Sequence, residues 1–419
     1  MTLSQKKDKI SLYGYAWQYA LEKRAFVLVS IFERMERLHM IAIKNATLVM
    51  RDHLIPDAVL FIEDGIIAGF GEMRNTLIPE DCQIVDAEGL YVGPGLVDIH
   101  NHAGGTHWFY DEPVEAAQFN LAHGTTSILA TLYFNMNKEQ LLEQAVCVQK
   151  AMKTREGANI AGFYMETPYM NPKFGADREN NPWKGPICRE DYMPLIEQVG
   201  TDAKVWVVGP EREHIEQFVI DAKKVNPTVK FAVGHSEASP QQIEALMPYG
   251  LCIGTHHTNA TGDRIFYPEV RGVCVDETVN YNREIYAEMI CDSRGIHVDP
   301  YMQRLIRKIK GEDRLILISD ACVFDGPIPD GYEGVTDLCF DFAGEIAGSK
   351  LTLEVACRNM MKHTGASIVD VFRYASTNPS NAVGFTDRGR IAKGLRADLV
   401  ICDHQMNIKS VILKGEFVK

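Results

Sequence analysis

The histidine pair in the stretch VDIHNHAGG is the first feature of this sequence whose chemistry can be inferred. His100 and His102 stand one residue apart, directly after an apolar run and before a glycine pair. Alternate residues of a strand point to the same face, so the two imidazoles can share one site. Imidazole is a ligand for zinc and related divalent ions. The pair therefore indicates a metal site at the end of a buried strand.

Further apolar runs end in side chains of the same kind. Glu166 follows IAGFYM, Asp320 follows RLILIS, and two more histidines stand in VGHS (His235) and GTHH (His256). A single histidine at a strand end is more often a polar core residue than a ligand. Five ligand candidates and a terminal aspartate at strand ends favour a metal centre instead, because imidazole and carboxylate suit divalent ions.

The runs that carry these side chains alternate with amphipathic segments such as KEQLLEQAVCVQKAMK. Short, continuously apolar strands are typical of a buried parallel sheet. We therefore predict an α/β protein whose main domain, residues 93–385, is a (β/α)8 TIM barrel. In such a barrel the strand ends meet at one mouth, where chemistry takes place. The eight strands are expected at GLVDIH, TTSILATL, IAGFYMET, KVWVVG, KFAVGHS, GLCIGTH, AEMICD and RLILISDA.

The two ends of the chain have a different pattern of apolar and turn residues. Residues 40–92 and 386–419 hold short alternating runs punctuated by Gly and Asp-Gly, a pattern that indicates antiparallel strands. We predict one small β-sandwich domain built from both ends. Residues 1–39 mix aromatic residues with charges of both signs. We expect them to be an extension ahead of a true start at Met40, with an amphipathic helix as the alternative.

Composition narrows the class of partner. The 419 residues carry a formal net charge of -13, which argues against nucleic acid or an anionic membrane surface as the main partner. The ten cysteines stand singly, without a C-x-x-C pair, which favours reduced thiols in a cytoplasmic protein. No apolar run reaches the roughly 18 residues of a membrane helix. We expect a cytoplasmic protein with neither a nucleic-acid nor a membrane partner.

The ordered motifs resemble those of the amidohydrolase superfamily and, within it, the N-acetylglucosamine-6-phosphate deacetylases. The likeness runs from about Met40 to the end of the chain. The segments that carry it are PGLVDIHNHAGG, HGTTSILATL, METPYMNPKFGA, VGHSEAS, THHTNA, GIHVDP, ISDA, EIAGSKLTL and TNPSNAVGFTDRGRIAKGLRADLVICD.

The resemblance implies a metal-dependent enzyme that converts N-acetylglucosamine 6-phosphate to glucosamine 6-phosphate and acetate. It implies one or two divalent ions per chain, zinc first, with iron, manganese or cobalt as alternatives. It also implies a homodimer. The principal ligands would be Glu166, His235 and His256, and a second ion would be held by His100 and His102.

The resemblance also assigns roles around the substrate. Asp320 would be the catalytic acid and base, which takes a proton from water and later delivers it to the leaving amine. His297 would hydrogen-bond a sugar hydroxyl or the carbonyl oxygen. The full set of implied substrate contacts is Ala176, Asn259, Ala260, His297, Ile346, Ala347 and Gly348.

Three departures from the family pattern concern the substrate. The chain reads Glu-Thr-Pro at 166–168 where the family has Glu-Gly-Pro. Asp177 stands where a polar residue, often histidine, is usual. Tyr267 lies near the place of an arginine that reaches the substrate phosphate in a partner subunit. If the phosphate is required, we expect Arg264 or Arg271 to replace that contact.

Other functions stay open at this point. Many cyclic-amide hydrolases of the superfamily bridge two metals with a carboxylated lysine at the end of the fourth strand, but Lys204 lies at the start of that strand. Glu166 is the bridging candidate instead. A non-catalytic sugar-binding protein could use the same barrel, but it would have no need of Asp320 as a proton shuttle. A different N-acyl substrate, or an N-acetyl sugar without phosphate, is also an alternative.

Overall fold

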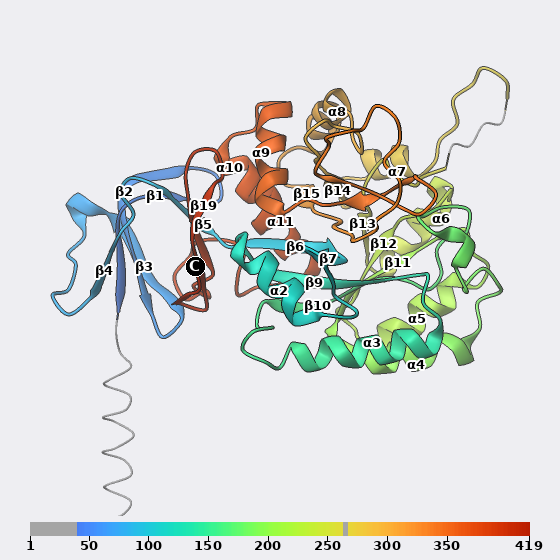
Figure 1. The fold of residues 1–419 in the computed structure, drawn as a ribbon, viewed down its shortest axis with the longest axis horizontal. Helices are drawn as coiled ribbons and strands as arrows, with labels where there is room; N and C mark the ends of the chain where they lie inside the picture. Colours follow the sequence, from blue (N-terminus) through green and yellow to red (C-terminus); the bar gives the residue numbers. More distant parts are fainter. Residues whose placement is uncertain (1–39, 263–266) are drawn as a thin grey trace, which may run out of the picture.

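The computed structural model describes residues 40–262 and 267–419, and Figure 1 shows two parts side by side along the longest axis. One part is a small β domain, and the other is a larger domain of strands surrounded by helices. The predicted extension at residues 1–39 and the candidate Arg264 lie outside the described residues.

The larger domain is a barrel of eight parallel strands in the order β15-β14-β13-β12-β11-β10-β9-β6. Backbone hydrogen bonds from Asp320 N to His100 O (3.0 Å) and from His102 N to Ala321 O (3.1 Å) join the ends of β15 and β6. The predicted barrel is confirmed. Its strands are β6 (Leu96–Asn101), β9 (Thr125–Tyr133), β10 (Ile160–Glu166), β11 (Ala203–Val208), β12 (Lys230–Val233), β13 (Leu251–Gly254), β14 (Tyr286–Ile290) and β15 (Leu315–Ile318).

A helix follows each barrel strand, as the amphipathic segments predict, and Figure 1 shows helices outside the strands. Capping boxes begin several of them, for example at Asn137 before α3 and at Ser239 before α6. The helices are α2 (Pro113–Ala122), α3 (Lys138–Ala151), α4 (Arg189–Val199), α5 (Ile215–Val225), α6 (Pro240–Leu246), α7 (Val275–Tyr281), α8 (Pro300–Lys310) and α9 (Leu353–Thr364), followed by α10 (Ile368–Phe372), the π-helix η5 (Arg373–Thr377) and α11 (Asn378–Val383). Single 3-10 turns are η1 (Met73–Asn75), η2 (Arg178–Asn180), η3 (Gly200–Asp202) and η4 (Met247–Tyr249).

The small domain is built from both ends of the chain, as predicted. Its sheet has the order β20-β19-β18-β5-β1-β2-β3, with β4 paired to β1, and it buries an apolar core of its own that includes Ile43, Leu60 and Leu399. The chain changes sheets at Gly95, whose N–H donates to Asp398 O. The domain boundaries at 92/93 and 385/386 stay predictions. The strands are β1 (Ile41–Val49), β2 (Leu54–Glu63), β3 (Ile66–Glu72), β4 (Gln83–Asp86), β5 (Tyr91–Pro94), β18 (Leu399–Cys402), β19 (Ile408–Leu413) and β20 (Glu416–Phe417).

Two short hairpins extend the barrel at the C-terminal ends of its strands. The first pairs β7 (Ala103–Gly104) with β8 (His107–Trp108), directly after β6. The second pairs β16 (Leu338–Phe340) with β17 (Ile346–Ser349), and it meets the end of β15 through a bridge between Ser349 and Ala321. The hairpins therefore build up one end of the barrel.

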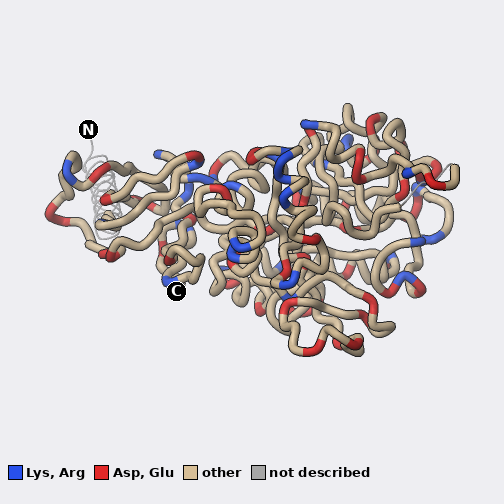
Figure 2. Tube along the Cα trace, turned by 90° about the horizontal axis from the view of Figure 1, so that it is seen from above, with Lys and Arg blue, Asp and Glu red and all other residues tan. Residues whose placement is uncertain are grey.

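Charged residues are interspersed rather than gathered. Figure 2 shows Lys and Arg positions mixed with Asp and Glu positions in both parts of the molecule. Among residues 40–262 and 267–419, no helix combines the length and the apolar character needed to cross a membrane.

Candidate active site

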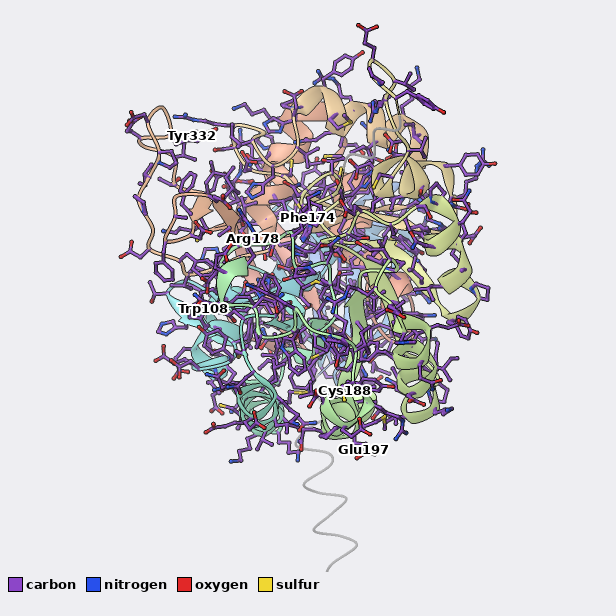
Figure 3. All side chains as sticks on the ribbon, turned by 90° about the vertical axis from the view of Figure 1, so that its right-hand side faces the viewer. Trp108, Phe174, Arg178, Cys188, Glu197 and Tyr332 are labelled. Atoms are coloured by element: carbon purple, nitrogen blue, oxygen red, sulfur yellow. The ribbon has the colours of Figure 1, made fainter. Side chains whose placement is uncertain are left out.

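A cavity of about 430 Å³ opens at the C-terminal ends of the barrel strands. Figure 3 views the molecule from this end, with Phe174 and Arg178 near the middle of the view. His100 lies beneath the cavity and is fully buried. The other sequence-predicted site residues all line the cavity: His102, Glu166, Ala176, His235, His256, Asn259, Ala260, His297, Asp320, Ile346, Ala347 and Gly348.

The first candidate metal group consists of Glu166, His235 and His256, whose ligand atoms all lie within 4.8 Å of one another. The Nε2 atoms of His235 and His256 lie 2.8 Å and 3.2 Å from Glu166 Oε1. The two Nε2 atoms are 3.0 Å apart. One carboxylate oxygen and two imidazole nitrogens therefore converge on one point.

The second candidate group consists of His100, His102 and Asp320, again with ligand atoms within 4.8 Å of one another. The Nε2 atoms of His100 and His102 lie 3.5 Å and 3.3 Å from Asp320 Oδ1. Glu166 connects the groups, because its Oε2 lies 3.2 Å from His102 Nε2 while its Oε1 faces the first group. This position is the one expected of a bridging carboxylate.

The lack of hydrogen-bond partners at three ring nitrogens tests whether these residues fit a metal. His100 Nε2, His102 Nδ1 and His235 Nδ1 are buried and have no hydrogen-bond partner among the described residues. Buried polar atoms nearly always have a partner, so His100 Nε2, which faces two carboxylates from 3.5–3.6 Å, is short of one. A mixed set of imidazole nitrogens and carboxylate oxygens is a donor set for a divalent ion. The residues fit the expected metal.

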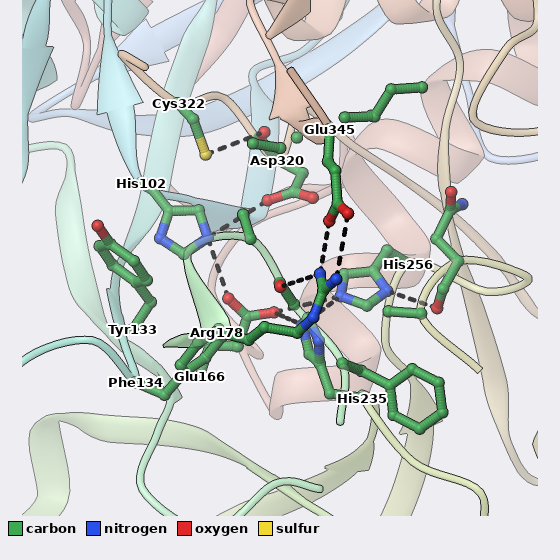
Figure 4. A pocket seen from close by; sticks show the side chains of 18 of the residues that line it. His102, Tyr133, Phe134, Glu166, Arg178, His235, His256, Asp320, Cys322 and Glu345 are labelled. Atoms are coloured by element: carbon green, nitrogen blue, oxygen red, sulfur yellow. Dashed lines mark hydrogen bonds and ion pairs between the residues drawn. The ribbon is translucent and has the colours of Figure 1, made fainter. Parts of the chain in front are cut away.

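The backbone turns sharply where three of these side chains leave their strands. His235, His256 and Asp320 have φ angles of 46°, 30° and 46°. Positive φ is uncommon outside glycine and costs conformational energy, and such residues cluster at functional sites. The strained turns direct the side chains into the cavity (Figure 4).

A buried acid behind the second group orients His100. Glu288 on β14 is fully buried, and its Oε2 lies 3.2 Å from His100 Nδ1. The same oxygen accepts the Tyr164 hydroxyl (3.2 Å) and the His256 N–H (3.3 Å). This contact leaves Nε2 of His100 directed toward the cavity. Sequence reasoning missed Glu288, although an acid within the apolar run AEMI was the available signal.

Asp320 and Glu166, which lie at the strand ends that form the floor of the cavity, are held in their charged form. Burial opposes the charge on Asp320, but His100 and His102 outweigh it and keep the pKa of the carboxyl well below its usual value. Burial likewise opposes the charge on Glu166, and His235 and His100 outweigh it and lower its pKa. Ionised carboxylates are the form that binds a metal or accepts a proton.

His297 connects two elements of the cavity wall. Its Nδ1 lies 3.1 Å from Asp292 Oδ2, and its Nε2 lies 3.1 Å from Gly348 O. Asp292 is fully buried and also accepts the N–H groups of Ile296 and His297. Burial alone would raise the pKa of Asp292, but these hydrogen bonds lower it to about 2. His297 is thereby fixed against the segment that holds Gly348.

An aromatic wall lies beside His102, and sequence reasoning missed it. Trp108 stacks on Tyr133, with ring centroids 5.9 Å apart, and Phe324 meets Trp108 edge-on at 5.3 Å. Tyr133 also contacts the His102 ring edge-on. Because these residues come from separate loops and strand ends, no local spacing in the sequence reports their contact.

The charged residues of the rim come from this chain's own loops. Arg271 pairs with Glu277 and does not line the cavity of its own chain, and its contact with a partner subunit's substrate stays a prediction. The carboxylate of Asp177 accepts a hydrogen bond from Asn180 and does not line the cavity either. Lys173 and the residue after Asp177, Arg178, line it instead.

Comparison with known proteins finds relatives that match most of the chain. Residues 91–418 match the Amidohydrolase family. The chain is 27% identical over 398 residues to the N-acetylglucosamine-6-phosphate deacetylase of Bacillus subtilis (strain 168), covering 89% of this chain and 96% of that protein. It is 26% identical over 387 residues to the N-acetylgalactosamine-6-phosphate deacetylase of Escherichia coli O157:H7, covering 88% and 97%.

Solved structures give the same result. A mutant of the N-acetyl-D-glucosamine-6-phosphate deacetylase from Mycobacterium smegmatis, in complex with N-acetyl-D-glucosamine-6-phosphate, superposes with a TM-score of 0.77. It is 25% identical to this chain, and the match covers 91% of this chain and 99% of that one. A Thermotoga maritima deacetylase at 23% identity, with a TM-score of 0.75, supports the fold.

Proposed function

The chain belongs to the amidohydrolase family, and on that premise we propose that it hydrolyses the acetamide of N-acetylglucosamine 6-phosphate to glucosamine 6-phosphate and acetate. One observation carries the proposal. Glu166 and Asp320 face two groups of histidines on the floor of a cavity whose walls come from the segments expected of a deacetylase. The similar proteins named above support the substrate class, since they are deacetylases of amino-sugar phosphates.

We infer that the two candidate groups hold the divalent metal. Glu166, His235 and His256 would hold one ion, and His100 and His102 would hold a second beside Asp320. When bound, such an ion lowers the pKa of a water molecule to about 7 and polarises the acyl carbonyl. The nitrogen and oxygen donors suit zinc, iron, manganese and cobalt alike, and we propose zinc first because the resemblance implies it.

Asp320 moves the protons in this proposal. Its carboxylate is ionised and lines the cavity, so its oxygen can accept a proton from the attacking water. An amine expelled without a proton is a very poor leaving group. The same carboxyl group therefore returns the proton to the amide nitrogen as the carbon–nitrogen bond breaks.

The cavity walls bind and orient the sugar in this proposal. His297 is held between Asp292 and Gly348, and its Nε2 would reach a sugar hydroxyl or the acyl oxygen by exchanging its hydrogen bond to Gly348 O. The amide nitrogen of the Asn259 side chain is buried and has no partner within the described part of the chain, so it is free to donate to the substrate. The remaining proposed contacts are Ala176, Ala260 and the segment 346–348.

The position of Lys204 favours this reaction over cyclic-amide hydrolysis through a carboxylated lysine. Lys204 lies near the start of β11, and its ammonium donates to Thr201 O at 2.8 Å. It does not line the cavity, so it cannot bridge the two candidate groups. Glu166 supplies the oxygen atoms between them.

Acetate release from N-acetylglucosamine 6-phosphate tests the proposed function. We expect the purified, metal-loaded protein to release acetate and glucosamine 6-phosphate in equal amounts. Asp320→Asn is the matched control, because it keeps the size of the side chain and removes the proton acceptor. A parent protein that binds the sugar phosphate without releasing acetate would identify a sugar-binding protein and contradict the proposal.

We further propose a homodimer, as the resemblance implies, and a cytoplasmic location. Sedimentation of the purified chain tests the first. Fractionation of cells that express the full chain tests the second.

A further inference from the structure

The cavity rim carries two basic residues, Lys173 and Arg178, and no other lysine or arginine of the described residues lines the cavity. The ammonium of Lys173 pairs at 2.9 Å with Glu237, which does not line the cavity, and the Lys173 side chain is 64% exposed. Arg178 differs, because its partner Glu345 lines the cavity as well. The Arg178–Glu345 pair therefore belongs to the cavity.

The guanidinium of Arg178 binds Glu345 through two parallel hydrogen bonds. Nη1 donates to Oε2 at 2.5 Å and Nη2 donates to Oε1 at 3.1 Å, and Figure 4 shows both. The planar fork of arginine matches a carboxylate and a phosphate in the same way. Glu345 thus occupies the position that an anionic group of a ligand would take.

The two loops are held together independently of this pair. Asp341 accepts the N–H of Asp177 at 3.3 Å and the N–H of Glu345 at 2.9 Å. Gly175 has a φ of +102°, and a Cβ there would lie 2.4 Å from a Phe134 ring atom. The glycine lets the loop pass close to the cavity floor. The backbone on either side of the pair is therefore held without the contact between Arg178 and Glu345.

We propose that Arg178 binds the 6-phosphate of the substrate and that Glu345 occupies the guanidinium until the phosphate displaces it. This inference rests on the proposed function. The side chains of Arg178 and Glu345 are 37% and 51% exposed, and ion pairs that water reaches contribute little to stability. A phosphate dianion offers the same fork two charges, and Glu345 can turn to solvent. Arg178 then determines the preference for phosphorylated sugars.

Steady-state kinetics with N-acetylglucosamine and its 6-phosphate test this role. Arg178→Ala is expected to raise KM for the phosphorylated sugar by about 10- to 100-fold more than for the neutral one, the scale of a lost charged hydrogen bond. Arg178→Lys is expected to restore part of the preference, since lysine keeps the charge without the fork. Glu345→Gln is expected to lower KM for the phosphorylated sugar, since it removes the competing charge.

Arg155→Ala is the matched control, because it removes an arginine that pairs with Glu416 outside the cavity. Its ratio of KM values is expected to equal that of the parent. Equal losses with both sugars in Arg178→Ala would show that Arg178 only holds the loops together. An unchanged ratio in Arg178→Ala, or a raised KM in Glu345→Gln, would also overturn the inference.

Calorimetric titration with glucose 6-phosphate separates this inference from the proposed function, because that sugar has no acetamide to hydrolyse. We expect the parent to bind it and Arg178→Ala to bind it at least 10-fold more weakly, with glucose as the uncharged control. This result without any deacetylation would refute the proposed function alone. Deacetylation together with equal affinities in the parent and in Arg178→Ala would refute this inference alone, and so would a parent that does not bind glucose 6-phosphate.

Discussion

The floor of the cavity is made of strand ends, whereas its rim is made of loops. On the floor, Glu166 and Asp320 are 4% and 7% exposed, and each faces more than one imidazole ring. At the rim, Arg178 and Glu345 are far more exposed and bind chiefly each other. A buried carboxylate surrounded by fixed rings cannot exchange partners without a large cost, but a half-exposed pair can. The floor therefore suits one fixed chemistry, and the rim suits a choice between ligands.

Removing two histidines from the floor should have the largest effect. We expect the purified parent to hold one or two divalent ions per chain, and His235→Ala combined with His256→Ala to lose the ion of the first group and all measurable activity. Elemental analysis of metal per chain checks the first result and acetate release checks the second. The same metal content in parent and double variant would show that the floor does not hold the metal.

Changing Asp320 to asparagine should have the next largest effect. The variant keeps the shape of the side chain but cannot accept or return a proton, so kcat should fall roughly 100-fold or more while the fold is kept. Circular dichroism and metal content serve as controls for the fold and the floor. Turnover close to that of the parent would move the proton transfer to another group, with His297 the next candidate.

Glu288 tests whether the floor depends on the residues behind it. Glu288→Gln should weaken metal binding about 10- to 100-fold, the scale found when a partner of a metal-binding histidine is replaced. A competition titration with a chelator measures the affinity. Arg271→Ala is the control, and it should bind metal as the parent does. Equal affinities in parent and Glu288→Gln would show that His100 is held by the barrel alone.

Asp292 gives the smallest effect, and one that depends on pH. Its folded pKa of about 2 lies below the ordinary 3.8, so its ionised form stabilises the fold above about pH 4 and that contribution is lost as the pH falls toward 2. Asp292→Asn should therefore lower the free energy of unfolding at pH 7 by about 2 kcal/mol. Denaturant unfolding at several pH values measures the difference, which should narrow below pH 4. A difference that stays constant with pH would contradict this account.

The sequence predicts the barrel and the floor for the same physical reason. Strands buried on both faces must be apolar along their whole length, so GLVDIH and RLILIS stand out from their surroundings. A polar side chain at the end of such a run is conspicuous, and the barrel brings all these ends together. His100, His102 and Asp320 could thus be placed in one site although they are far apart in sequence.

The rim could not be predicted in this way, because the direction of a loop side chain depends on single backbone angles. Asp177 and Arg178 are neighbours, yet only Arg178 lines the cavity, because Asp177 adopts a φ of 52° and its carboxylate turns back to Asn180. Trp108 and Phe324 meet only after the first and eighth strands are side by side. Neither the direction of Arg178 nor the contact between Trp108 and Phe324 produces a periodic pattern in the sequence.

The backbone hydrogen bonds that join the ends of β6 and β15 also determine the order in which a growing chain can complete its site. Translation delivers Glu166, His235 and His256 by the residues that directly follow the sixth barrel strand, so these ligands are all present before the last two strands of the barrel are made. Asp320 and Ala321, which form backbone hydrogen bonds with His100 and His102, are synthesised about half a chain length later. In the proposed mechanism, a nascent chain that already contains Glu166, His235 and His256 still lacks Asp320, the proton acceptor. Amide hydrolysis would begin only when the last strand closes the barrel.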